Sequence, residues 1–224
     1  MKHSTLASAV ITAASLMGSV LAGLGIATLV QGLPFHASDQ TLLLLVLIPL
    51  FGGGAIWGFL LARFHGLPNT KGASIAGSLS FGVGVIGVAD LLGSLERVLV
   101  QGHRLPGVPI HVKFTLLFVP ATFLIATIGA SAILLVSGNR VRWFPSALAA
   151  GAAAALSFLA VNLLLDALGF RVGAPHAVER ATMLTVAFLG SAAAALSAGA
   201  SLGRFLSTGS VHIPPPDPNG SPQA

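Results

Sequence analysis

The chain has 224 residues, of which 54% are apolar and only 8% are charged, and its mean hydropathy is +0.92. A typical soluble domain is about 25% charged, so this composition excludes an ordinary soluble globule and predicts a protein whose main partner is a lipid bilayer. The net charge of +5 comes from eleven Lys and Arg residues scattered singly among apolar runs. A nucleic-acid-binding surface would cluster them, so we expect no nucleic acid partner.

Six apolar segments are each long enough to cross a bilayer, which takes about 20 residues of helix. We therefore expect an all-α fold, a polytopic membrane helix bundle whose six transmembrane helices form one domain over residues 1–206. The expected helices cover about residues 4–30, 41–62, 72–95, 114–137, 146–168 and 181–204. Residues 207–224 are rich in proline and nearly uncharged, which predicts a disordered cytoplasmic tail.

The first apolar segment follows Met1, Lys2 and His3, an arrangement that also occurs in secretory signal peptides. The apolar part of a signal peptide has about 7–15 residues, and the run here is about twice that length. We therefore favour a retained membrane-spanning helix over a cleaved signal.

The second segment contains Pro49 and then three consecutive glycines, Gly52, Gly53 and Gly54. Proline removes a backbone donor and clashes with the preceding helical turn. One interpretation is a broken helix that exposes backbone groups at mid-membrane, as in several transporter folds, which makes the three glycines candidates for a solute path. The alternative, which we favour, is a proline-kinked helix packed closely against its neighbour.

The third segment presents small residues along one helical face, where they would let neighbouring backbones approach closely in lipid. These residues are Ala73, Gly77, Ser80, Gly84 and Gly87. The same segment contains the pattern G-x-G-x-x-G at residues 82–87, but it lacks the preceding strand and the downstream acid of a dinucleotide-binding site. We assign this pattern to helix packing.

Polar residues gather toward the end of the predicted bundle that lies away from the termini. Asp90 lies near the end of the third segment, and Asn162 and Asp166 share a face of the fifth because they are four residues apart. An ionisable group inside a membrane is costly, so it marks either a functional site or a pair. Asp90, Asn162 and Asp166 are therefore candidates for a solute or ion path.

A structural explanation of the same residues is a set of ion pairs at the membrane interface, and we favour it slightly. Asp166 and Arg180 flank the connection between the fifth and sixth segments and form the pair we expect first. Glu179 and Arg97 lie near the same level and are further candidates for such pairs.

Two internal relations suggest how the segments pack. The string AAAALS occurs at residues 152–157 and 192–197, at matched depth on consecutive antiparallel helices, which predicts a close-packed hairpin. Short strings at the ends of the first three helices resemble strings about 107 residues later, such as GSLERVL at 93–99 and ASLGRFL at 200–206. A three-plus-three inverted repeat and chance similarity both explain this second relation, because only eight of forty aligned positions are identical.

An even number of spans places both termini on one side of the membrane. That side collects six Lys and Arg residues against five on the other, so the positive-inside rule predicts a multi-pass protein of the cell membrane with both termini cytoplasmic.

Motifs for chemistry are scarce. The sequence has no H-E-x-x-H, no G-x-S-x-G and no phosphate-binding loop, and without cysteine it has no thiolate metal ligands. We expect no cofactor and no metal site, and an intramembrane enzyme is the least supported function. A small permease-like protein for a small solute or ion is favoured. The alternative is a non-catalytic membrane subunit, assembly protein or homo-oligomer whose small-residue faces bind partner helices.

Overall fold

A computed structural model describes residues 2–31, 39–96, 110–138, 142–169 and 176–209. Six α-helices make up almost all of these residues, and no strand occurs among them, so the expected all-α class is confirmed. The helices are α1 (Lys2–Gln31), α2 (Asp39–Phe64), α3 (Thr70–Glu96), α4 (Ile110–Val136), α5 (Trp143–Ala167) and α6 (His176–Gly209). The predicted tail overlaps the last turn of α6, and its remainder lies outside the described residues.

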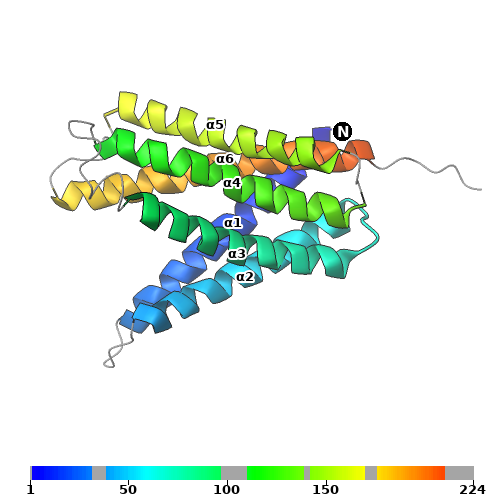
Figure 1. The fold of residues 1–224 in the computed structure, drawn as a ribbon, viewed down its shortest axis with the longest axis horizontal. Coiled ribbons are helices and arrows are strands. Elements are labelled where there is room, and N and C mark those ends of the chain that lie inside the picture. Colours follow the sequence, from blue (N-terminus) through cyan, green and yellow to red (C-terminus); the bar gives the residue numbers. More distant parts are fainter. Residues whose placement is uncertain (1, 32–38, 97–109, 139–141, 170–175, 210–224) are drawn as a thin grey trace, which may run out of the picture.

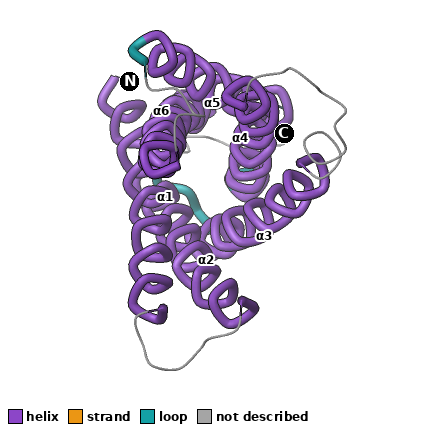
Figure 2. Tube along the Cα trace, turned by 90° about the vertical axis from the view of Figure 1, so that its left-hand side faces the viewer, coloured by secondary structure: helices purple, strands orange, loops and turns teal. Residues whose placement is uncertain are grey.

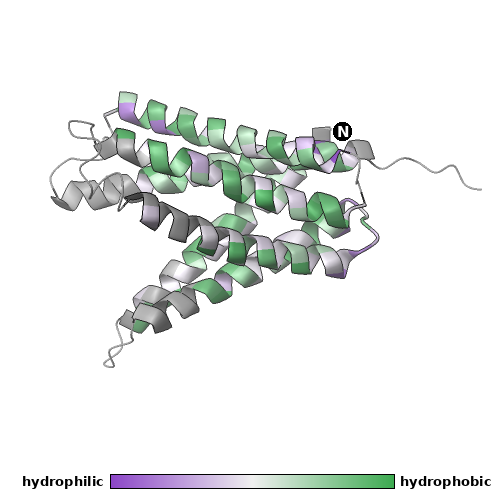
Figure 3. Ribbon diagram, viewed as in Figure 1, coloured by the Kyte–Doolittle hydropathy of each residue, from purple (hydrophilic) through white to green (hydrophobic). Residues whose placement is uncertain are grey.

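Five of the helices contain described segments long and apolar enough to cross a membrane. These segments are His3–Val30, Leu47–Phe64, Thr115–Val136, Trp143–Ala167 and Thr185–Ser207. Many large apolar side chains on them face outward, among them Leu6, Ile56 and Leu156, and Figure 3 shows hydrophobic residues along the length of the bundle. Such extensive apolar exposure fits lipid rather than water and characterises the chain as a membrane protein.

The six helices run alternately up and down and form a ring in chain order (Figures 1 and 2). Each helix packs against its neighbours in the sequence, α6 closes the ring against α1, and α4 also contacts α6. The start of α1 and the end of α6 lie at the same end of the bundle, which we call the termini end. Toward the opposite end, α1 and α2 diverge from α4, α5 and α6 (Figure 1).

Small residues set the close approach of α2 and α3. A Cβ atom on Gly58 would overlap the carbonyl oxygen of Ala73, and one on Gly77 would overlap that of Gly54. Ser80 and Gly84 on α3 are also buried, whereas Gly87 is exposed. Ala73 and Gly77 of the predicted small-residue face therefore pack against α2, as expected for helices that associate without a hydrophobic driving force, whereas Gly84 faces Ile128 of α4.

Helix α2 is continuous across Pro49, which contradicts the broken-helix interpretation and agrees with close packing of α2 against its neighbours. Two of the three glycines that follow Pro49 pack against neighbouring helices. Gly53 faces Ser19 of α1 and Gly54 faces Gly77 of α3, while Gly52 has open space beside it. Neighbouring helices on two sides hold α2 together where proline removes one backbone hydrogen bond.

The α5–α6 hairpin has the matched depth that the repeated string AAAALS predicts. The hydroxyl oxygen of Ser197, at the end of the second copy, lies 3.2 Å from the carbonyl oxygen of Ala153 in the first, and 2.9 Å from that of Ala193 in its own helix. Alanine at these positions keeps the two helices close enough for a side chain of one to reach the backbone of the other.

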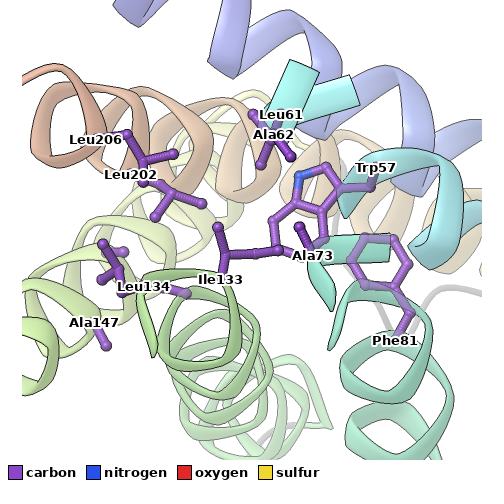
Figure 4. Close-up of a cluster of buried hydrophobic side chains, with 12 residues drawn as sticks. Trp57, Leu61, Ala62, Ala73, Phe81, Ile133, Leu134, Ala147, Leu202 and Leu206 are labelled. Atoms are coloured by element: carbon purple, nitrogen blue, oxygen red, sulfur yellow. The ribbon is translucent and has the colours of Figure 1, made fainter. Parts of the chain in front are cut away.

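The termini end is closed by a cluster of buried apolar side chains from α2 to α6, which we call the plug (Figure 4). Its members are Trp57, Leu61, Ala62, Ala73, Phe81, Ala130, Ile133, Leu134, Ala147, Ala150, Leu202 and Leu206. A second buried cluster joins α5 and α6 through Phe158, Leu165 and Val186, and partly buried residues of α4 pack against it.

Candidate solute-binding cavity

A cavity of about 330 Å³ lies inside the ring near the middle of the helices. All six helices contribute to its wall, including Leu16 of α1, Leu50 of α2 and Phe81 of α3 on one side. Ile125 of α4 and Ala195 of α6 contribute on the other. A cavity at the centre of a helix bundle, built from every helix, is where a bundle places a ligand.

Trp57 forms the wall of this cavity that adjoins the plug. The side chain is only 3% exposed, and its ring stacks on Phe81 with the centroids 5.1 Å apart. Its indole Nε1–H donates to the hydroxyl oxygen of Thr12 over 2.9 Å, and the far edge of the ring lies beside Gly129 of α4. Trp57 thus joins α2 to α1, α3 and α4 at one point, with its polar atom satisfied.

The hydroxyl groups in the cavity wall mostly have their hydrogens engaged. Thr12, Ser19 and Thr122 each donate to the carbonyl oxygen four residues earlier in their own helix, over 2.8, 2.6 and 2.7 Å. Ser191 of α6 also lines the cavity and makes no hydrogen bond with the described residues. Since a hydroxyl that has donated its hydrogen can still accept, the wall presents oxygen acceptors more than donors.

No charged side chain lines the cavity among the described residues. Its surface is otherwise aliphatic or aromatic, with alanine and glycine from α4, α5 and α6. An isolated ion would lose its hydration there without compensation, so the cavity favours an uncharged occupant.

A line of polar contacts connects the cavity with the termini end. Thr12 donates to the carbonyl oxygen of Ser8, and the Ser8 hydroxyl forms a 2.7 Å hydrogen bond with Nε2 of His65. His65 lies just beyond the end of α2 and is half-buried. Burial disfavours the charged imidazolium and lowers the pKa of His65 below its ordinary value of 6.5, so the ring is neutral at neutral pH.

Asn162 and Asp166, predicted from their spacing, lie on α5 and do not line the cavity. Asn162 is buried, and its side-chain amide donates to the carbonyl oxygen of Phe158 over 2.8 Å. A Cβ on Gly190 of α6 would come within 3.3 Å of the same amide. Asn162 therefore packs at the α5–α6 contact.

The remaining charged candidates cannot be paired from the described side chains. Asp90 is in α3, and Glu179 and Arg180 are in the first turn and a half of α6, but the structure describes only their backbone. Arg97 lies outside the described residues, so the Asp166–Arg180 pair and the other predicted pairs stay predictions.

The predicted glycines, Gly52, Gly53 and Gly54, do not line the cavity either. Part of the α1 wall was visible in the sequence as hydroxyls inside an apolar segment, since Thr12 and Ser19, which line the cavity, share a helical spacing with Ser8. The same face packs on α6, where Cβ atoms on Gly199 and Gly203 would meet Thr12 and Ser8. That spacing was the signal that could have identified this side of the site.

Comparisons with known proteins add no identity to this geometry: no protein-family model, no curated protein and no solved structure matches the chain. In the described part of the chain, no cluster of His, Asp and Glu could hold a metal ion. The cavity and its polar line are therefore the features from which a function is argued.

Proposed function

We propose that this chain is a small permease-like membrane protein that binds a small solute in the cavity between its six helices and passes it across the membrane. The observation that carries the proposal is that every helix contributes to one central cavity. A change in the tilt of any helix would alter the shape of such a cavity, which is what alternating access to a central site requires.

In this proposal α3 is the sixth membrane span and both termini are cytoplasmic in the cell membrane. The charges support this orientation, because Arg63, Lys71, Arg142 and Arg204 are exposed near the termini end. Short connections rich in Lys and Arg favour the cytoplasmic side.

The three-plus-three inverted repeat also belongs to this proposal. If α1 is matched with α4, α2 with α5 and α3 with α6, each helix keeps equivalent neighbours around the ring. The α1–α6 contact then corresponds to the α3–α4 contact. Inverted repeats of this kind place substrate sites at the interface between the two halves.

The plug and the divergence of α1 and α2 support a particular state. Apolar side chains fill the ring at the termini end, whereas α1 and α2 move apart from α4–α6 at the other end. We assign this structure to a state in which the cavity is closed toward the cytoplasm and opens toward the outer side.

The alternative, a subunit that binds partner helices through small residues, receives less support. Gly54, Gly58 and Gly77 pack within the chain, as do Gly199 and Gly203. These faces are therefore occupied and not available to a partner. We also assign Asn162 to helix packing, because its amide already donates to the Phe158 carbonyl.

Cysteine labelling in membranes tests the proposal, and the chain suits it because it contains no cysteine. Single Cys residues would replace Ala126 or Ser191, which line the cavity, and Ala160, which is on the exposed surface of α5. The small uncharged reagent N-ethylmaleimide, which suits the neutral lining of the cavity, would be added to membrane vesicles. We expect modification at residues 126 and 191, because thiols react as thiolates, which form where water reaches them.

Ala160→Cys supplies the matched control, because a thiol facing lipid stays protonated and unmodified by the same reagent. Equal protection of residues 126, 191 and 160 would show a cavity without access to water and would contradict a solute path.

A further inference from the structure

The cavity wall limits the chemistry of its occupant. Resting on the proposed function, we infer that the solute is an uncharged, largely apolar molecule about the size of two fused rings that carries one hydroxyl group. Volume, charge and hydrogen bonding each support a different part of this assignment.

Volume sets the size. A buried cavity of about 150 Å³ lined by apolar side chains is sufficient for benzene. The cavity here, at about 330 Å³, has roughly twice that volume, so it accommodates a bicyclic compound and is small for a sugar or peptide with a hydration shell. Trp57 and Phe81 in the wall provide aromatic surface for such rings.

Charge excludes ions and zwitterions. No Asp, Glu, Lys or Arg is among the cavity-lining residues, and no side-chain amide is either. A carboxylate or ammonium group entering this space would exchange water for methyl and aromatic groups. The occupant must therefore be neutral when bound.

Hydrogen bonding sets the polar group. The Thr12 oxygen already accepts from Trp57, and the Ser19 hydroxyl faces Gly53 of α2. Thr122 has donated its hydrogen to Phe118 and keeps an acceptor oxygen, while Ser191 makes no hydrogen bond with the described residues. These two residues lie on α4 and α6, which contact each other. A solute hydroxyl can donate to Thr122 and accept from Ser191.

The test measures binding of three probes that differ only in the polar group: 2-naphthol, naphthalene and 2-naphthoate. Purified full-length protein in detergent would be titrated by calorimetry at neutral pH, with protein-free detergent as the blank. We expect saturable binding of 2-naphthol, weaker binding of naphthalene and none of 2-naphthoate.

Two kinds of variant locate the binding. Thr122→Val should weaken 2-naphthol about fivefold, the effect of one neutral hydrogen bond, and leave naphthalene unchanged. Thr115→Val, on the same helix and outside the cavity wall, is the matched control and should change neither. Ala126→Leu and Ala198→Leu each fill the cavity from a different helix and should abolish binding of both neutral probes, with folding checked by gel filtration.

The outcomes separate this inference from the function on which it rests. Binding of 2-naphthoate as tight as that of 2-naphthol, or an unchanged 2-naphthol affinity in Thr122→Val, would overturn the assigned solute class. Failure of the wild type to bind any neutral probe would also overturn it. In each case modification of cysteines at residues 126 and 191 would still support a solute path of different chemistry, and protection of both would remove the path itself.

Discussion

Polar side chains inside this bundle are few, and most of the described ones near the cavity have a hydrogen-bond partner. The Trp57 indole donates to the Thr12 hydroxyl, which donates to the backbone carbonyl of Ser8. The Ser8 hydroxyl in turn forms a hydrogen bond with the His65 ring. Breaking a hydrogen bond in an apolar interior is costly, because no water is present to hydrogen-bond with the separated donor and acceptor. This chain of contacts fixes α1 against α2 at the level of the plug.

We expect His65 to make the stability of the bundle depend on pH. Its pKa is lowered in the folded state, so the unfolded chain binds a proton more readily as the pH falls below 6.5. The free energy of unfolding is therefore retained above that pH and decreases as the pH falls from 6.5 through the folded pKa. Melting of the detergent-solubilised protein at pH 7.5 and 5.5 should show this loss, and His65→Gln should reduce it.

The control for this prediction is His3→Gln, since His3 is exposed near the start of α1. That variant should keep the wild-type dependence on pH. An identical loss of stability in wild type and His65→Gln would show that another group is responsible.

At the scale of the helix, small residues decide which elements touch. The sequence predicted the small face of α3 because its spacing is a local property. It could not show which neighbour this face meets, and Gly87, which continues the same spacing, is exposed. The three glycines after Pro49 were equally ambiguous, because a solute path and close packing of a neighbouring helix both require residues without a side chain.

The α2–α3 contact predicts opposite effects of two identical substitutions on one helix. Gly58→Ala places a methyl group against the Ala73 carbonyl, where backbone cannot move aside, and should destabilise the protein by about 1–3 kcal/mol. Gly52→Ala adds a methyl group in open space and should leave stability equal or slightly higher, because alanine favours helix more than glycine does.

Thermal melting in detergent would compare the two variants, with about 2–4 °C expected per kcal/mol for a chain of this size. A similar fall in both would indicate that glycine is needed for the backbone of α2 rather than for its contact with α3.

The α5–α6 hairpin can be tested by crosslinking. Ala153→Cys combined with Ser197→Cys should form a disulfide on mild oxidation, because Ser197 reaches the backbone of residue 153. Ala152→Cys with Ser197→Cys is the matched control and should not crosslink, since Ala152 is exposed away from the contact. Faster crosslinking of the control pair, detected by mobility on a denaturing gel, would indicate a different register between the helices.

At the scale of the whole molecule, six alternating helices bring the start of α1 and the end of α6 to one end of a closed ring. Closure depends on the α1–α6 contact, which joins residues almost 200 positions apart through Ser8 and Gly203. Because the ring is closed, the six helices surround a central cavity.

Topology reporters test this arrangement. A fluorescent reporter that matures only in the cytoplasm should be active when fused after residue 209. An alkaline phosphatase, which folds only outside the cytoplasm, should be active when fused within residues 97–109, the α3–α4 connection. Six spans with cytoplasmic termini require both results, and phosphatase activity at the C-terminal fusion would reverse the orientation or change the number of spans.

Composition and periodicity by themselves determined that this chain forms apolar helices suited to lipid, because helix formation and hydropathy depend on residues that are close in the sequence. The matched strings on α5 and α6 likewise determined their relative depth. Only the tertiary structure decided that Thr12, Trp57, Thr122 and Ser191 surround one cavity while Asn162 lies outside it. The physical reason is that a cavity is a property of residues far apart in sequence, which the close packing of small side chains brings to one level.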